Sequence, residues 1–116
     1  MVLGPASDGG YYLIGLKRPH QHLFTQIAWG TQTVARSTCK RAADIGLATT
    51  LLPEWYDVDD IATFKLLLGE LFEAKSFAPA LCSARAHHTR ALIQSLLEST
   101  DFKNRLTLNG CRRAAE

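Results

Sequence analysis

The first 75 residues alternate short apolar runs with stretches of helical periodicity. Residues 1–3, 11–16 and 47–52 are rich in branched and aromatic side chains, which predicts three β-strands, with residues 11–16 buried on both faces. Residues 31–46 repeat small or apolar side chains every three or four positions, which predicts a helix between an N-cap threonine and a terminal glycine. Strands that alternate with helices in this way predict an α/β fold with at least partly parallel pairing.

The second half of the sequence has a helical pattern. An aspartate cap at Asp57 or Asp59 is expected to open a helix that ends near Ala74, and a further helix is expected over residues 79–97. The residues after 97 are polar and are expected to be frayed. We therefore expect two parts: a domain over residues 1–75 and a helical extension over residues 76–116. The helix expected between Asp57 or Asp59 and Ala74 carries an apolar stripe that should face a core: Ile61, Phe64, Leu68, Leu71 and Phe72.

Composition excludes several classes of protein. Hydrophobic residues make up 47% of the chain and charged residues 21%, which is ordinary for a folded soluble domain. The formal net charge is only +2, so there is no electrostatic case for a nucleic-acid partner. No apolar run approaches the roughly 18 residues that span a bilayer, so no membrane partner is expected. Three cysteines without metal-site spacing indicate a reducing compartment, and the expected location is cytoplasmic.

A glycine-rich loop follows the first predicted strand. Gly4–Gly10 has three glycines, and the absence of Cβ atoms at Gly9 and Gly10 lets the backbone approach a ligand closely. Asp8 in this loop is suited to accept hydrogen bonds from ligand hydroxyls or to bind a hard cation. A tight turn in which Asp8 bonds its own backbone explains the same residues equally well.

A second acidic segment precedes the helix that is expected after residue 57. Asp57 and Asp59 point the same way if the segment is extended, so two carboxylates can share one divalent ion. Mg²⁺ suits such a site because it takes one or two carboxylates and keeps waters for phosphate oxygens. The alternative is helix capping, in which an aspartate satisfies exposed amides and the helix dipole.

An aromatic residue lies just before the first long helix. Trp29 precedes Gly30 and Thr31, a position where an indole ring can form the wall of a sugar or base pocket. A buried tryptophan that anchors the loop is the structural alternative.

Several of these segments, taken in order, resemble a known family. They are Gly4–Leu16 with its GPxxDGGYYLIGL pattern, Ile27–Thr31, Leu52–Pro53 and Trp55–Asp60. They resemble the C-terminal half of a bacterial glycosyltransferase-type family with a GT-A-like fold. These proteins are known as selenodomain-associated transferases and are related to MobA-like and CofC-like nucleotidyltransferases. The resemblance covers about residues 2–75.

The resemblance implies a partial Rossmann-like sheet of the nucleotide-diphospho-sugar transferase type, with flanking helices and without the N-terminal half. It implies a ligand that is a nucleotide or nucleotide-sugar, together with Mg²⁺ or Mn²⁺. Asp8, Gly9, Gly10, Trp29 and Thr31 are the expected substrate-binding residues. Metal ligands are expected at Asp57 and Asp59, and no catalytic residue is assigned.

Two functions remain open at this stage. The first is a transferase-family protein that binds nucleotide with a metal and has little activity alone, because related enzymes carry their nucleotide loop in the N-terminal half. Its partner would then supply the missing half. The second is a non-catalytic interaction module that keeps part of the fold and forms a homodimer through open strand edges.

Overall fold

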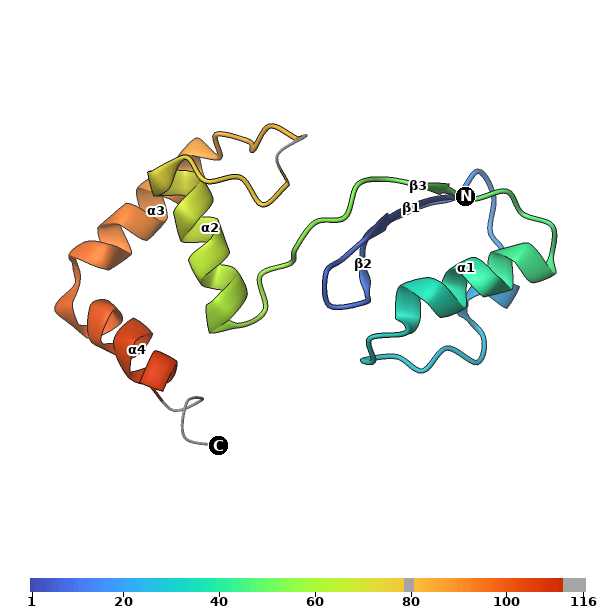
Figure 1. Cartoon of the computed structure of the whole chain (residues 1–116), viewed down its shortest axis with the longest axis horizontal. Helices are drawn as coiled ribbons and strands as arrows, with labels where there is room; N and C mark the ends of the chain where they lie inside the picture. Colours follow the sequence, from blue (N-terminus) through green and yellow to red (C-terminus); the bar gives the residue numbers. More distant parts are fainter. Residues whose placement is uncertain (79–80, 112–116) are drawn as a thin grey trace. The chain divides into compact units, whose positions relative to one another are not determined.

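A three-stranded sheet and four α-helices form the described part of the chain, which comprises residues 1–78 and 81–111 of a computed structural model (Figure 1). The chain divides into two units, Met1–Asp57 and Val58–Glu116. The first unit contains the sheet, a short 3-10 helix and one α-helix, and the second contains three α-helices. The protein is therefore mixed α/β. The division after Asp57 differs from the boundary after residue 75 that the sequence led us to expect.

The sheet of the first unit has the strand order β2-β1-β3. The central strand β1 (Val2–Pro5) pairs antiparallel with β2 (Tyr11–Gly15) and parallel with β3 (Thr50–Leu51). The expected parallel pairing is thus present on one side of β1. Parallel neighbours need a long crossover, and the chain between β2 and β3 supplies one that includes a helix.

That crossover provides the core under the sheet. The 3-10 helix η1 (Gln21–Phe24) packs against α1 (Val34–Asp44), and Leu3 of the central strand has no exposed surface. Small side chains on α1 allow this close packing, as Ala42 and Thr38 are also fully buried. The buried residues of this unit are Leu3, Gly4, Ala6, Leu23, Ile27, Val34, Thr38, Ala42 and Tyr56.

The strands are less buried than the sequence predicts. β2 is not covered on both faces, because the side chains of Tyr12 and Leu13 are 43% and 41% exposed. The third strand comprises only Thr50–Leu51 instead of residues 47–52, and Leu51 is 60% exposed. Both corrections have one physical reason. An apolar run shows which side chains favour burial, but the unit places helices against only part of this small sheet (Figure 1).

Tyr12 crosses the central strand and connects its two neighbours. The register of β1 and β2 shifts between Gly4 and Pro5, so Tyr12 is an extra residue on β2. Its ring lies directly over Gly4, where an added Cβ would come within 2.4 Å of the ring. The Tyr12 hydroxyl then donates a hydrogen bond to the carbonyl oxygen of Pro53, at 2.8 Å, just beyond β3. Glycine is required at position 4 because the tyrosine occupies the space of a side chain.

The ends of α1 are partly as expected. The residue before the helix is Thr33 rather than Thr31, and its side chain caps no backbone amide. At the other end, Gly46 has a φ of 64°, the left-handed conformation that a glycine after a helix commonly adopts. The helix stop at Gly46 is therefore confirmed.

The second unit is helical throughout its regular part. It contains α2 (Ile61–Glu73), α3 (His87–Glu98) and α4 (Thr100–Cys111). Helix α4 corrects the expectation of a frayed tail after residue 97, and α3 begins later than expected. Residues 79–80 of the expected helix lie outside the described part. Leu71 and Ile93 are buried, and Phe64 of the expected apolar stripe meets Phe102 of α4 edge to face at 6.2 Å.

The cap of α2 is Asp60. Its carboxylate accepts a hydrogen bond from the Thr63 backbone N–H at 2.8 Å, and the Thr63 hydroxyl interacts in return with the Asp60 backbone N–H at 3.2 Å. This reciprocal arrangement is a capping box. The expectation that Asp57 or Asp59 opens the helix is thus wrong, since a third aspartate performs the capping. Neither Asp57 nor Asp59 is needed for that task.

Among the residues that the structure describes, no helix combines the length and the apolar character that a membrane span requires.

Tyr12 makes two contacts, the hydrogen bond to Pro53 and the packing of its ring on Gly4, and we expect mutations to distinguish their contributions to stability. Tyr12→Phe should lower the free energy of unfolding by about 0.5–1 kcal/mol, because it removes one partly exposed hydrogen bond. Gly4→Ala should lower it further, because the new methyl group displaces the ring as well. Urea unfolding followed by circular dichroism measures both changes. Equal stability of Gly4→Ala and the unchanged protein would contradict this assignment.

We expect Asp60→Ala to destabilise the second unit by about 0.5–2 kcal/mol, the usual cost of losing an N-cap. Asp59→Ala is the matched control, because it removes an identical side chain one position earlier that caps nothing. Thermal unfolding followed at 222 nm reports the helices of this unit. A larger loss for Asp59→Ala than for Asp60→Ala would show that the cap is misassigned.

Candidate functional site

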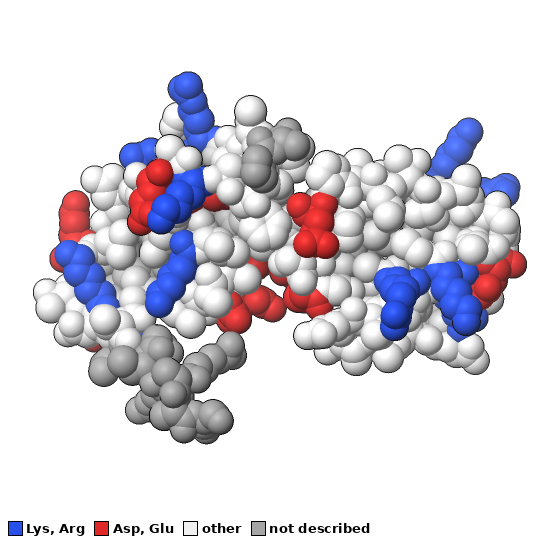
Figure 2. All heavy atoms as spheres, viewed as in Figure 1, with Lys and Arg blue, Asp and Glu red and all other residues white. Residues whose placement is uncertain are grey.

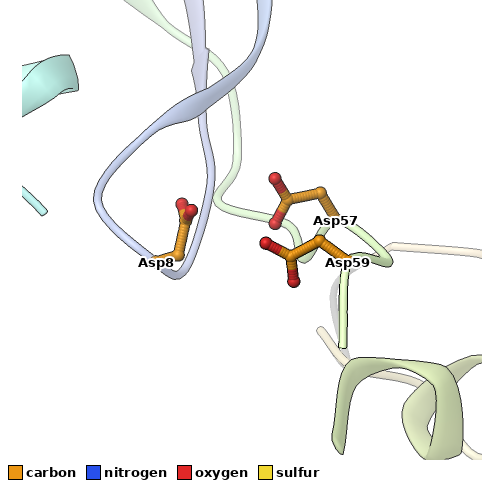
Figure 3. A group of neighbouring side chains, drawn as sticks. All are labelled: Asp8, Asp57 and Asp59. Carbon is orange, nitrogen blue, oxygen red and sulfur yellow. The ribbon is translucent and has the colours of Figure 1, made fainter. Parts of the chain in front are cut away.

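Two aspartates of the first unit, Asp8 and Asp57, converge at one end of the sheet (Figure 3). Asp8 lies in the loop between β1 and β2, and Asp57 and Asp59 lie in the chain that follows β3. One carboxylate oxygen of Asp8 lies within 4.8 Å of one carboxylate oxygen of Asp57. Asp8 and Asp57 both belong to the first unit, so their proximity is a property of that unit. Asp59 follows Asp57 by two residues and belongs to the second unit.

Backbone pairing brings Asp57 close to Asp8. After β3, the chain continues beside β1: Leu52 N–H donates to the Leu3 carbonyl at 2.8 Å, and Trp55 N–H donates to the Pro5 carbonyl at 3.1 Å. Ser7 N–H in turn donates to the Trp55 carbonyl at 2.8 Å. These hydrogen bonds hold the chain that precedes Asp57 beside the chain that leads into the Asp8 loop.

Aromatic packing supports the same segment. The rings of Trp55 and Tyr56 stack with centroids 5.9 Å apart, and Tyr56 is buried. Burial of Tyr56 directly before Asp57 anchors the chain, while the Tyr12 bond to Pro53 fixes it a few residues earlier. The side chains of Tyr56 and Tyr12 thus fix the chain that leads to Asp57.

Asp8 makes the turn contact that the sequence offered as one alternative. One of its carboxylate oxygens accepts a hydrogen bond from the Gly10 N–H at 2.8 Å. This bond orients the side chain and still leaves the second oxygen available to another group. Asp8 and Asp59 are exposed, whereas Asp57 is more covered. The turn and ligand interpretations of Asp8 are therefore compatible.

Gly9 packs the same loop against the start of α1. Its φ of 91° is in the region that favours glycine, and an added Cβ would meet the Gln32 carbonyl oxygen at 2.0 Å. The Gly9 carbonyl accepts a hydrogen bond from the Ala35 N–H at 2.9 Å, within the first turn of the helix. Gly9 is therefore required by backbone packing, and this contact holds the loop that carries Asp8 against the start of α1.

The remaining expected site residues lie in the segment that leads into α1. Trp29 is 56% exposed, which excludes the interpretation of a buried loop anchor. The Thr31 hydroxyl donates to the Ala28 carbonyl at 2.7 Å and lies 2.8 Å from the Thr33 hydroxyl, so it stabilises its own turn. Gly9 meets this segment at Gln32, whereas Gly10 lies beside the Asp8 carboxylate.

Sequence reasoning missed the residues that hold the site together. Tyr12 was expected to be a buried strand residue, and Pro53 only to end a strand. The signal that was available is the glycine at position 4, since a glycine in a central strand often marks a close approach of another group.

Comparison with known proteins identifies one family over part of the chain. A family described as "Uncharacterized protein conserved in bacteria (DUF2064)" matches residues 1–31. This segment contains β1, the Asp8 loop, β2 and the chain up to Thr31, and it ends before Asp57 and Asp59. No curated protein and no solved structure matches the chain. The likeness to this bacterial family is thus limited to the N-terminal part of the first unit.

We expect Gly9→Ala to disturb the candidate site more than any other single methyl addition in this unit. The left-handed backbone alone costs about 1–2 kcal/mol for a residue with a Cβ, and the clash with Gln32 adds to this cost. Gly30→Ala is the matched control, because its φ is 75° but a Cβ there would have no neighbour within 4 Å. Urea unfolding should show the larger loss for Gly9→Ala, and equal losses would refute the packing role.

Proposed function

We propose that the first unit binds a nucleotide or nucleotide-sugar through Mg²⁺ or Mn²⁺ and belongs to a transferase-type domain of GT-A-like, Rossmann-like ancestry. Asp8 and Asp57 are the proposed metal ligands within this unit. The observation that carries this proposal is the convergence of Asp8 and Asp57 from opposite ends of the unit. Helix capping does not explain that convergence, because Asp60 is the cap of α2.

The donor set fits a hard divalent cation. Both ligands are carboxylates, whereas zinc sites commonly include histidine or cysteine. Ligand oxygens on opposite sides of Mg²⁺ lie about 4.2 Å apart, twice the usual metal–oxygen distance. The oxygens here lie within 4.8 Å of one another, so small rotations of exposed side chains suffice to close the site.

The surrounding residues suit a phosphorylated sugar ligand. A bound divalent cation offsets phosphate charge and orients the group that is transferred. Gly9 packs against Gln32, so Gly10 is the glycine that leaves loop backbone without a Cβ beside the Asp8 carboxylate, where a ligand can approach. The exposed ring of Trp29 offers a flat apolar surface of the kind that stacks on a sugar or a base. The Thr31 hydroxyl holds the turn that presents this ring.

A second candidate function is a non-catalytic module that assembles through its sheet. It is favoured by the exposed apolar residues on the outer strands, Leu13 of β2 and Leu51 of β3. Edge strands with unpaired backbone groups readily add a strand from another chain. The partner would be a second copy or a protein that supplies further strands, and in the first case the module is a homodimer.

We expect the unchanged protein to bind Mn²⁺ and expect Asp8→Asn and Asp57→Asn each to weaken binding at least tenfold. Each substitution removes one negative charge that attracts the ion and replaces a carboxylate ligand with a neutral amide oxygen, which is a weaker ligand. Isothermal titration calorimetry measures the affinity, and Asp101→Asn on α4 is the matched control. A nucleotide-sugar present at one hundred times its Kd should then add about 2.7 kcal/mol of stability in the presence of metal.

The two candidate functions give different results in this experiment. Metal-dependent stabilisation by a nucleotide or nucleotide-sugar supports the first. A stable dimer in sedimentation experiments that responds neither to metal nor to nucleotide supports the second. Unaltered Mn²⁺ affinity in Asp8→Asn and Asp57→Asn would rule out the metal site.

A further inference from the structure

The second unit contains a cavity of about 590 Å³ that is separate from the aspartates of the candidate metal centre. It lies between the end of α2, the segment over residues 81–85 and the start of α3. Cavities of 300–1,000 Å³ are the usual size for small-molecule ligands. The volume is therefore sufficient for a ligand about as large as a sugar phosphate or a mononucleotide.

The lining of this cavity is predominantly basic. Lys75, Arg85 and Arg90 line it together with His87, whereas Glu70 is the only carboxylate among the described lining residues. Glu70 already accepts a hydrogen bond from the Ser83 hydroxyl at 2.7 Å and one from the Phe77 N–H at 3.5 Å. The positive charges thus exceed the negative charge within the cavity. On the face seen in Figure 2, both Lys and Arg side chains and Asp and Glu side chains stand on the second unit.

The two arginines keep their hydrogen-bond donors for a ligand. Arg90 lies over the ring of Phe72, with its guanidinium carbon 5.1 Å from the ring centroid, and this stacking restricts the side chain. In the described part of the chain, the ion pairs of this unit join Lys75 with Glu73 and include neither arginine. Arginine is well suited to phosphate because its planar donors bind two oxygens at once.

The N-terminus of helix α3 adds a weaker positive charge to the cavity. It starts at His87, which lines the cavity, and no side chain caps its first amides. The residue before it, Ala86, has a φ of 39°, a conformation that alanine rarely adopts. The amides of a free helix start carry partial positive charge. This effect supplements the arginines and does not by itself define the site.

We propose that this cavity binds the phosphate group of a phosphorylated small molecule without a metal ion. Arg85 and Arg90 hold the phosphate oxygens, and the remaining volume accepts the organic part of the ligand. This proposal is independent of the metal centre, because all of its residues lie in the second unit.

The test uses the full chain in EDTA at low ionic strength, with glucose 6-phosphate and inorganic pyrophosphate as probes and glucose as the uncharged comparison. Calorimetry should detect binding of the phosphorylated probes but not of glucose. Arg85→Gln and Arg90→Gln should each weaken binding at least tenfold, because charge-assisted hydrogen bonds contribute strongly. Arg105→Gln on α4, outside the cavity lining, should leave the affinity unchanged.

A second measurement locates the ligand. Cys82 is exposed and lines the cavity, so a bound ligand should slow its alkylation, as measured by peptide mapping. Cys39 is the internal reference. Burial raises the pKa of its thiol, which lowers its thiolate fraction, and its labelling should not respond to the ligand.

Four outcomes would overturn the proposal. The first is failure of both phosphorylated probes to bind, and the second is equal binding of glucose and glucose 6-phosphate. The third is unchanged affinity in both arginine variants. Binding that requires Mn²⁺ and disappears in Asp8→Asn would also overturn it, but would support the proposed function of the first unit. Conversely, loss of Mn²⁺ binding alone leaves the present proposal intact.

Discussion

The parallel pairing of β1 with the chain around β3 is the constraint on which the first unit depends. It begins between Val2 and Thr50 and continues past the short strand to an isolated bridge between Ala6 and Trp55. Everything between the two segments, including η1 and α1, is folded back as a consequence of this pairing. The same ladder places Asp57 beside the Asp8 loop. Fold and candidate site therefore have a common origin, since the hydrogen bonds that hold the sheet together also bring the carboxylates together.

The sequence pattern predicted which segments are strands and which are helices better than it predicted their lengths and burial. Alternating strand and helix patterns indicated an α/β protein, and Gly46 marked the end of a helix correctly. The burial of β2 and the length of β3 were wrong, because side-chain type does not reveal how much cover the rest of the chain provides. Helix α4 was missed since its residues are mostly polar. Its contact with α2 includes the aromatic pair of Phe64 with Phe102.

The candidate sites differ in how far sequence could predict them. Asp57 and Asp59 attracted attention through their spacing, but with Asp60 they form a run in which sequence cannot tell the cap from the ligands. Only the bond from the Thr63 amide to Asp60 makes that distinction. The basic cavity of the second unit gave no motif at all, because Arg85 and Arg90 approach the end of α2 only after the chain has turned back. Spacing rules detect neighbours in sequence and do not detect this arrangement.

The long connection between the two paired strands has a consequence for the order of folding. Contacts between residues that are far apart in sequence form slowly, because a large loop must close before any of its bonds is gained. The backbone hydrogen bonds within the helices of the second unit join residues that are close in sequence, so they form without closing a large loop. The Asp8 and Asp57 carboxylates therefore come together only after this loop has closed and the sheet is complete.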